Sequence, residues 1–167
     1  QLSSGTATHS IVAEGTGASD TVGWKAIADV CFLKGTEIKL TNNTSKLIEN
    51  IEKDDILKSY EFEEFDNLNQ DAEYLMNWYS KSINGESSST KVVKLWENKT
   101  DKYYIINDKL RITPEHLVFI KKNDNYEWFP AKNVKEGYEI FNSENEFETI
   151  KSIEMIEKSE SVYNIKL

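Results

Sequence analysis

The sequence predicts an all-β fold of many short strands with one or two short helices. Three features support this prediction: short apolar runs rich in β-branched and aromatic residues, turn-forming residues between these runs, and no long helical pattern of apolar positions. Many strands at such spacing are typical of all-β domains. The expected strands are Glu37–Leu40, Ile56–Glu61, Lys91–Glu97, Tyr103–Asn107, Leu110–Thr113, Leu117–Lys121, Glu139–Phe141, Glu148–Ile156 and Ser161–Ile165.

Turn residues join several of these strands. Asn107–Lys109 and Lys122–Asn125 each hold Asn and Asp between two apolar runs, which favours tight hairpin turns. The segment Glu86–Thr90 is polar and rich in serine, so we expect an exposed loop there.

Two segments are expected to be helical. Lys46–Ile51 predicts a short helical turn, and Asn69–Ser80 predicts a longer helix. The longer helix would place four apolar residues roughly on one face: Leu68, Leu75, Met76 and Tyr79.

A change of composition near residue 30 divides the chain into a flanking segment, 1–30, and a domain, 31–167. The first segment holds four of the seven glycines, is dominated by Gly, Ser, Thr and Ala, and cannot bury much apolar surface alone. We therefore expect it to be part of a host protein. Its composition resembles that of small-residue segments in phage tail-fibre and other virion proteins, which leaves the location open between a virion and a bacterial cytoplasm.

Charge and composition exclude several classes of function. A net charge of −9, with Arg111 as the single arginine, argues against a nucleic-acid partner, because phosphates require a basic face. No apolar run approaches the roughly 20 residues that span a bilayer, so we expect no membrane partner. A single cysteine excludes an internal disulfide and a Cys-rich metal site, so we expect neither metal nor cofactor.

Cys31 is the candidate nucleophile. It stands at the composition break, four residues before Gly35, and a thiol is the best side-chain nucleophile at neutral pH. Through a five-membered ring, it can attack the carbonyl carbon of Val30 and exchange the Val30–Cys31 amide for a thioester. The alternative is a buried core cysteine, since free cysteines are among the most buried residues.

The segment Thr113–His116, in RITPEHLVFI, supplies the candidate partners. An amide-to-thioester shift needs a general acid for the departing nitrogen, and His116 is suited to that role. The Thr113 hydroxyl is a candidate for holding the carbonyl oxygen. Taken by itself, a histidine in such a segment is more often a structural residue of a turn than a proton donor.

Together these blocks resemble the Hint domains of inteins and related autoprocessing proteins. The resemblance covers residues 31–167 in order: CFLKGTEI, LIENIEKDDILKSYE, RITPEHLVF, WFPAKNVKEGYEI and SVYNIKL. It implies a horseshoe-like Hint fold and a single-turnover, self-processing activity, either protein splicing or N-terminal autocleavage. The catalytic residues would be Cys31, Thr113 and His116, and the scissile bond Val30–Cys31. Asp54 and Tyr138 stand where the family commonly has glycine and aspartate, so we expect local changes in those two turns.

One part of the family pattern is missing. Inteins carry a further histidine and a terminal His-Asn pair that releases the C-terminal flank, and residues 31–167 contain no His-Asn pair. We therefore expect N-terminal cleavage at most, and an open sheet edge along Val162–Leu167 that a C-terminal Hint segment or a second chain would cover. Besides its own N-terminal segment, this is the partner we expect.

Two other functions stay open. The first is a virion structural protein with an inert Hint-like fold, and the second is a carbohydrate-binding domain that would use exposed Trp78 or Trp96.

Overall fold

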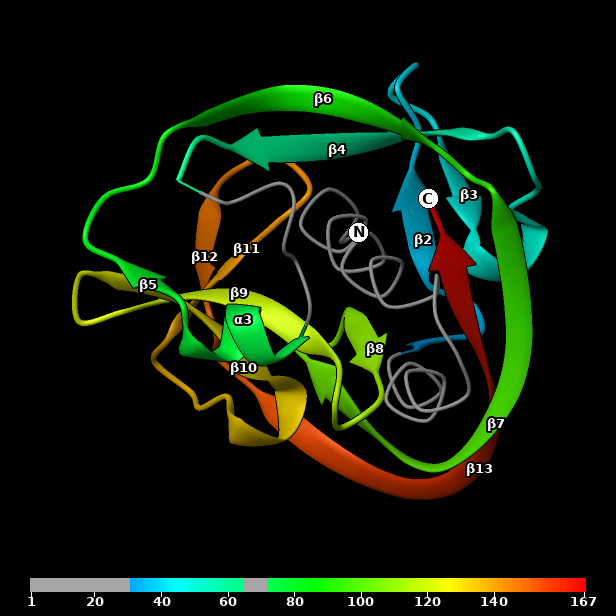
Figure 1. Ribbon diagram of the computed structural model, residues 1–167. Coiled ribbons are helices and arrows are strands. Elements are labelled where there is room, and N and C mark those ends of the chain that lie inside the picture. Colours follow the sequence, from blue (N-terminus) through cyan, green and yellow to red (C-terminus); the bar gives the residue numbers. More distant parts are fainter. Residues whose placement is uncertain (1–30, 65–71) are drawn as a thin grey trace.

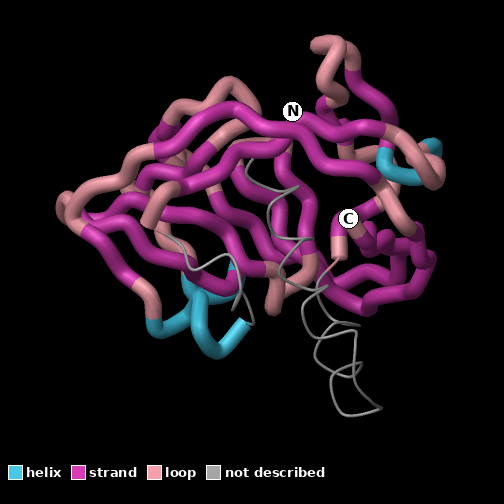
Figure 2. Tube along the Cα trace, turned by 45° about the horizontal axis from the view of Figure 1, so that its top comes forward, coloured by secondary structure: helices cyan, strands magenta, loops and turns pink. Residues whose placement is uncertain are grey.

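The prediction of an all-β fold is confirmed by a computed structural model, which describes residues 31–64 and 72–167. The predicted flanking segment 1–30, including Val30, lies outside the described residues. Strands form nearly all of the regular structure, as the tube in Figure 2 shows. The strands are β1 (Phe32–Leu33), β2 (Glu37–Lys39), β3 (Ser45–Leu47), β4 (Ile56–Phe62), β5 (Tyr79–Ser80), β6 (Gly85–Lys91), β7 (Lys94–Ile106), β8 (Leu110–Ile112), β9 (Leu117–Lys122), β10 (Asn125–Pro130), β11 (Glu139–Phe141), β12 (Phe147–Thr149) and β13 (Ile153–Lys166).

Helices are few and short. They are α3 (Ala72–Asn77) and two 3₁₀ turns, η1 (Ile48–Asn50) and η2 (Ala131–Asn133). Within the described residues, none is long and apolar enough to cross a membrane.

Two long strands dominate the arrangement. β7 and β13 pair in antiparallel register from Ile106 with Ile153 to Lys94 with Lys166, and they curve together along one side of the molecule (Figure 1). With β8 and the short β1 they close a small barrel in the order β1, β13, β7, β8. A second sheet has the order β12, β11, β9, β10, β5, and two separate two-stranded ribbons pair β2 with β3 and β4 with β6.

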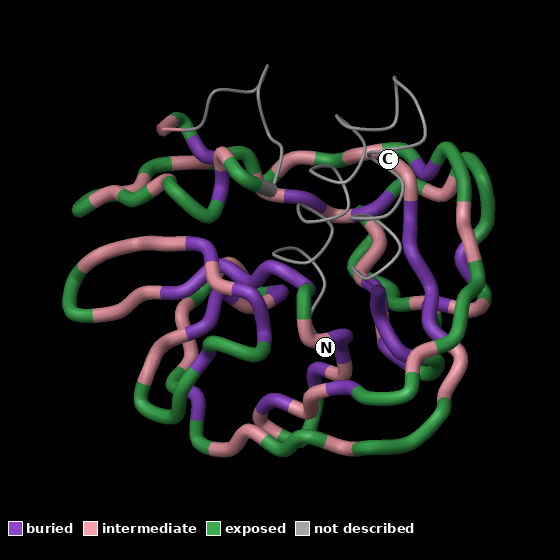
Figure 3. Tube along the Cα trace, turned by 60° about the horizontal axis from the view of Figure 1, so that its bottom comes forward, coloured by how far each residue is buried: buried purple, intermediate pink, exposed green. Residues whose placement is uncertain are grey.

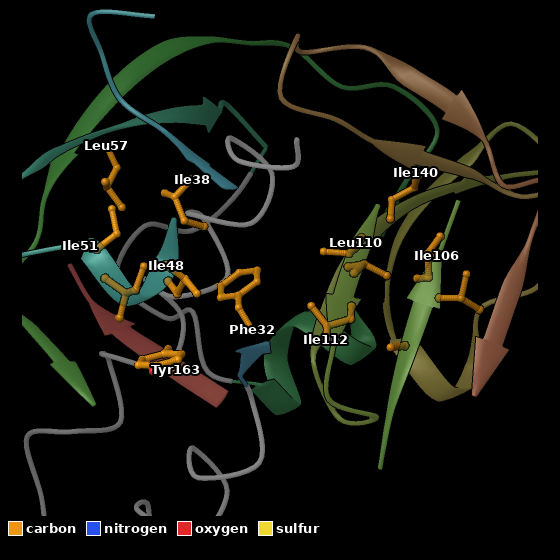
Figure 4. Close-up of a cluster of buried hydrophobic side chains, with 14 of the residues drawn as sticks. Phe32, Ile38, Ile48, Ile51, Leu57, Ile106, Leu110, Ile112, Ile140 and Tyr163 are labelled. Carbon is orange, nitrogen blue, oxygen red and sulfur yellow. The ribbon is translucent and has the colours of Figure 1, made fainter. Parts of the chain in front are cut away.

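Three buried clusters hold these elements together. The largest joins the barrel to the β2–β4 region and to β9 and β11 of the five-stranded sheet, and Figure 4 shows Phe32, Ile48 and Ile140 in it. A second, aromatic cluster joins the five-stranded sheet to β4 and α3, with Phe62, Phe119, Trp128 and Phe141 among its members. In Figure 3 the buried segments gather towards the interior, while most hairpin tips are exposed.

The third cluster is the one that matters for the site. It contains Cys31, Leu33, Tyr103 and Val162, and we call it the Cys31 cluster. Because successive side chains of a strand point to opposite faces, Phe32 enters the main core while Cys31 and Leu33 enter this smaller cluster. The apolar start of the predicted domain is therefore buried on both faces.

Several predicted boundaries differ from the structure. The expected loop Glu86–Thr90 is wrong, because it forms most of β6, which pairs with β4 along its whole length. Its serines alternate between half-buried and exposed on an exposed ribbon, where polar residues suit a strand. The helix predicted over Asn69–Ser80 covers only Ala72–Asn77 of the described residues, and β5 follows it.

The face predicted for that helix is also wrong in part. Leu75 is buried, but Met76 and Tyr79 are exposed, and Leu68 lies outside the described residues. Six residues allow too few turns for a continuous apolar stripe.

The strands expected at Lys91–Glu97 and Tyr103–Asn107 belong mostly to the single strand β7, and Ser161–Ile165 lies within β13. Backbone pairing continues through the polar residues between them, which the apolar pattern does not reveal. By contrast, the expected strand Glu148–Ile156 is interrupted between β12 and β13.

The two departures from the family pattern do lie in turns. Asp54 has φ +73°, a left-handed conformation that glycine adopts without strain and Asp tolerates. Its N–H donates to the Val92 carbonyl at 2.8 Å, which ties the turn to the end of β6. Tyr138 follows Gly137, which supplies the positive φ in the other turn.

Candidate functional site

Cys31 lies immediately before β1, one of the four strands of the barrel. Phe32 pairs with Ile112 of β8 on one side and with Tyr163 of β13 on the other. This double pairing fixes the backbone next to Cys31, whose side chain is fully buried within the Cys31 cluster.

Thr113 binds the Cys31 backbone through three hydrogen bonds. The Cys31 N–H donates to Thr113 Oγ1 at 2.9 Å, and the Thr113 N–H donates to the Cys31 carbonyl at 3.0 Å. The Thr113 hydroxyl also lies 3.4 Å from that carbonyl oxygen, to which it can donate. One buried hydroxyl thus contacts both the amide nitrogen and the carbonyl oxygen of Cys31.

A tight turn brings His116 back to the same place. The His116 N–H donates to the Thr113 carbonyl at 3.1 Å, and Pro114 occupies the second position of this turn, where its fixed φ is favourable. From the other side, Ala131 N–H donates to the His116 carbonyl and Lys132 N–H to the Pro114 carbonyl. The block that begins at Trp128 therefore supports the turn that begins at Thr113.

The His116 imidazole is completely buried and lies against Phe32, with ring centroids 4.5 Å apart. Burial lowers the pKa of His116 to about 3, and a hydrogen bond with the Cys31 backbone opposes this shift only in part. At neutral pH the imidazole is therefore uncharged. A neutral imidazole carries one N–H donor and one nitrogen that can accept a proton.

Gly35 and Arg111 shape the turn after β1. Gly35 has φ +83°, and its N–H donates to the Glu49 carboxylate at 2.8 Å. The Arg111 guanidinium donates to the Lys34 carbonyl at 3.2 Å and lies 5.4 Å from the Tyr103 ring centroid. Arg111 thereby links β8 to the turn, while Tyr103 belongs to the Cys31 cluster.

A pocket of about 200 Å³ opens beside Thr113. Its lining includes two buried residues: Thr113, which hydrogen-bonds the Cys31 backbone, and Val162, which belongs to the Cys31 cluster. The other lining residues come from β7 and from the turn: Lys99, Thr100, Lys102, Pro114 and Glu115.

The structure thus brings Cys31, Thr113 and His116 together, as the sequence predicted. The Thr113 hydroxyl accepts a hydrogen bond from the Cys31 N–H. The role predicted for it at the Val30 carbonyl lies outside the described residues and stays a prediction. Sequence reasoning missed the pocket lysines and the Arg111 contact. Arg111 reaches the site through the pairing of β8 with β7, and Lys99 and Lys102 reach it through the pairing of β7 with β13.

The predicted open edge along Val162–Leu167 is covered by a second strand at its first two residues only. Val162–Lys166 pairs with β7, and Val162 and Tyr163 also pair with β1, because β13 lies between these two strands in the barrel. Among the described strands, Asn164–Lys166 pair with β7 alone, so the partner expected at this edge stays a prediction. Within the described residues, no group of three or more His, Cys, Asp or Glu side chains forms a candidate metal site.

Comparisons with known proteins locate this fold among inteins. No family model and no curated protein matches the sequence. Among solved structures, the chain is similar to a bacterial intein-like domain from Clostridium thermocellum, with a TM-score of 0.62 and 18% identity over 82% of this chain and 86% of that one. It is also similar to a DnaB intein from Synechocystis sp. PCC 6803, with a TM-score of 0.56 and 15% identity over 81% and 85% of the two chains. The described part of the chain therefore has the Hint fold of an intein-like domain.

Proposed function

We propose that this domain carries out an N-to-S acyl shift at the Val30–Cys31 bond. Cys31 Sγ attacks the Val30 carbonyl carbon, a C–S bond forms, and the C–N bond to Cys31 breaks. The thiol proton is transferred, in net terms, to the Cys31 nitrogen. The products are a thioester and a free α-amine on Cys31, still within one molecule.

The observation that supports this proposal most strongly is the hydrogen bond from the Cys31 N–H to Thr113 Oγ1. The Cys31 nitrogen is the leaving group of the proposed reaction. A leaving group held in place from the start needs less reorganisation as its bond breaks. The contact links the two blocks on which the family resemblance depends.

His116 completes the proposed proton transfer. With a pKa of about 3 it is neutral at pH 7, so it does not begin as a cationic acid. It acts as a relay, accepting the thiol proton and passing it to the departing nitrogen. The short-lived imidazolium is a strong acid because its burial disfavours the charge.

The proposal is tested by the masses of products from freshly prepared protein incubated with excess dithiothreitol. A fragment that begins at Cys31, together with a thiol adduct ending at Val30, is the expected result. Intact chain after prolonged incubation, with the fold verified by circular dichroism, would contradict it.

One observation favours a second candidate, an inert Hint-like domain in a structural protein. Cys31 is fully buried, which limits the access of water or an external thiol to its sulfur. The same incubation separates the two candidates, because an inert domain gives no fragment while a processing domain does.

Release of a C-terminal flank would need residues from elsewhere. Residues 31–167 hold a single histidine, His116, and no His-Asn pair. We propose that a C-terminal Hint segment bearing that pair completes the reaction. Addition of a synthetic segment with His-Asn followed by Cys or Ser should yield a spliced product, and failure of such a segment to bind the folded chain would count against this partner.

A further inference from the structure

We infer that the pocket beside Thr113 is the binding site for the acyl acceptor, and that it selects small thiols carrying a carboxylate. This inference rests on the proposed acyl shift, since it concerns the molecule that removes the thioester. It assigns a ligand class to the pocket formed by β7, β13 and the turn after β8.

Access to Cys31 is the first argument. The Cys31 side chain is fully buried, so an acceptor needs a path to the reacting bond. Two buried residues line the pocket: Thr113, which hydrogen-bonds the Cys31 backbone, and Val162, which belongs to the Cys31 cluster. A ligand in the pocket therefore lies against one residue that binds the Cys31 backbone and one that belongs to the Cys31 cluster.

The size of the pocket is the second argument. Pockets for drug-sized ligands measure roughly 300–1,000 Å³. At about 200 Å³, this one admits a ligand with only a few non-hydrogen atoms. A short aliphatic thiol fits that limit, whereas a folded protein segment does not.

The charges around the pocket are the third argument. Lys99 and Lys102 line it, and among the described residues neither ammonium group forms an ion pair. The one carboxylate in the lining, Glu115, lies 2.6 Å from Lys132 Nζ, which offsets its charge. The lining residues together therefore carry one net positive charge, which favours an anionic ligand, although the whole chain carries a net charge of −9.

The chemical step balances without any further reagent. The acceptor thiolate attacks the Val30 carbonyl carbon of the thioester, and a new C–S bond forms as the bond to Cys31 Sγ breaks. Cys31 leaves as a thiolate and takes up the proton that the acceptor thiol released. The pocket lysines bind the acceptor carboxylate, and they take no part in bond breaking.

Three thiols of similar size and different charge provide the kinetic test: 3-mercaptopropionate, 2-mercaptoethanol and cysteamine. Rates of cleavage at Val30–Cys31, expressed per thiolate, are compared in the wild type, in Lys99→Gln/Lys102→Gln and in the matched control Lys81→Gln/Lys151→Gln. Both double variants change the net charge equally, and Lys81 and Lys151 lie outside the pocket lining.

The pocket variant should react about three- to tenfold more slowly with 3-mercaptopropionate, which is the combined effect of two exposed charge contacts. It should lose no rate with cysteamine, and the control should behave as the wild type. Added salt should reduce the preference, because both lysines are exposed. Equal thiol preferences in all three proteins would overturn the inference.

A binding measurement keeps this result separate from the proposed function. Cys31→Ala protein cannot form the thioester, so its amide NMR signals can be followed during titration with 3-(methylthio)propionate. Shifts at Thr100, Thr113 and Val162 that disappear in the added Lys99→Gln/Lys102→Gln background support the site. If no thiol cleaves the wild type, the acyl shift fails, and this titration still decides whether the pocket binds the anion. Absence of these shifts overturns the inference.

Discussion

The Cys31 amide nitrogen and the Thr113 hydroxyl oxygen lie 2.9 Å apart although 82 residues separate them in the sequence. The pairing of β1 with β8 creates this contact, because Thr113 follows Ile112, the residue opposite Phe32. Cys31 and Thr113 are both buried, so water cannot replace either partner if this hydrogen bond is lost.

Replacement of Thr113 by valine should slow cleavage at Val30–Cys31. Valine keeps the shape of the side chain but leaves the Cys31 N–H without its acceptor, and an unsatisfied buried donor costs about 1–3 kcal/mol. If that cost appears in the transition state, the rate falls by about 5- to 150-fold. Rates from intact mass spectrometry check this expectation.

Thr36→Val is the matched control for that variant. Thr36 is also buried and donates its hydroxyl to the Leu33 carbonyl at 2.7 Å, but its hydroxyl makes no hydrogen bond to Cys31. It should lose stability with much less effect on the rate. An equal loss of rate in the two variants, at equal stability, would mean that Thr113 acts through the fold alone.

The candidate site residues could be singled out from the sequence because they lie in short blocks with distinctive chemistry, and the structure brings them together. Cys31 is the only thiol, and His116 is the only histidine of the predicted domain. The hairpin turns at Asn107–Lys109 and Lys122–Asn125 could also be predicted from the sequence, and the structure confirms them through positive φ angles at Asn107 and Asn123.

The remaining features depend on partners far away in the chain. β6 is polar and forms a strand because β4 supplies its backbone partners, and β7 continues through polar residues because β13 follows it. The pocket has the same origin, since pairing between Ser161 and Lys99 places β7 beside Val162. Local apolar periodicity contains no information about such pairings.

Replacement of His116 by alanine should slow thioester formation by about 10²–10⁴-fold, the usual cost of losing a proton-transfer group. His116→Gln keeps polar atoms in the site but cannot relay the proton, so it should be similarly slow. If the rate of thioester formation in the folded variant falls by less than about threefold, His116 has a structural role, because removal of a proton-transfer residue should slow the reaction more than that.

The free energy of unfolding should depend on pH through the protonation of His116. Its pKa is about 3 in the folded chain and near 6.5 when exposed, so protonation favours the unfolded state. The contribution of the neutral, buried His116 to the free energy of unfolding is complete above pH 6.5. It decreases by about 1.4 kcal/mol per pH unit as the pH falls towards 3.

Urea denaturation between about pH 4.5 and 6.5 measures this slope above the range in which most carboxylates titrate. The difference in slope between wild type and His116→Gln isolates the histidine, whatever the absolute stability of the variant. Parallel curves would show that His116 is not buried in its neutral form.

Two glycines test whether the turn after β1 matters for the reaction. Gly35 and Gly137 both have positive φ, and neither has a crowded neighbour at the position of an added Cβ. Gly35→Ala and Gly137→Ala should therefore each cost about 1–2 kcal/mol of stability. Only Gly35→Ala should also slow cleavage, since that turn fixes the backbone after Cys31; equal rates in the two variants would contradict this role.

The thioester itself is the central claim, and trapping with hydroxylamine tests it most directly. Hydroxylamine converts a thioester at Val30 into a C-terminal hydroxamate and releases a fragment that begins at Cys31. The wild type should give both products, and Cys31→Ala should give neither. Cleavage of Cys31→Ala at the wild-type rate, or a folded wild-type chain that stays intact, would contradict the account.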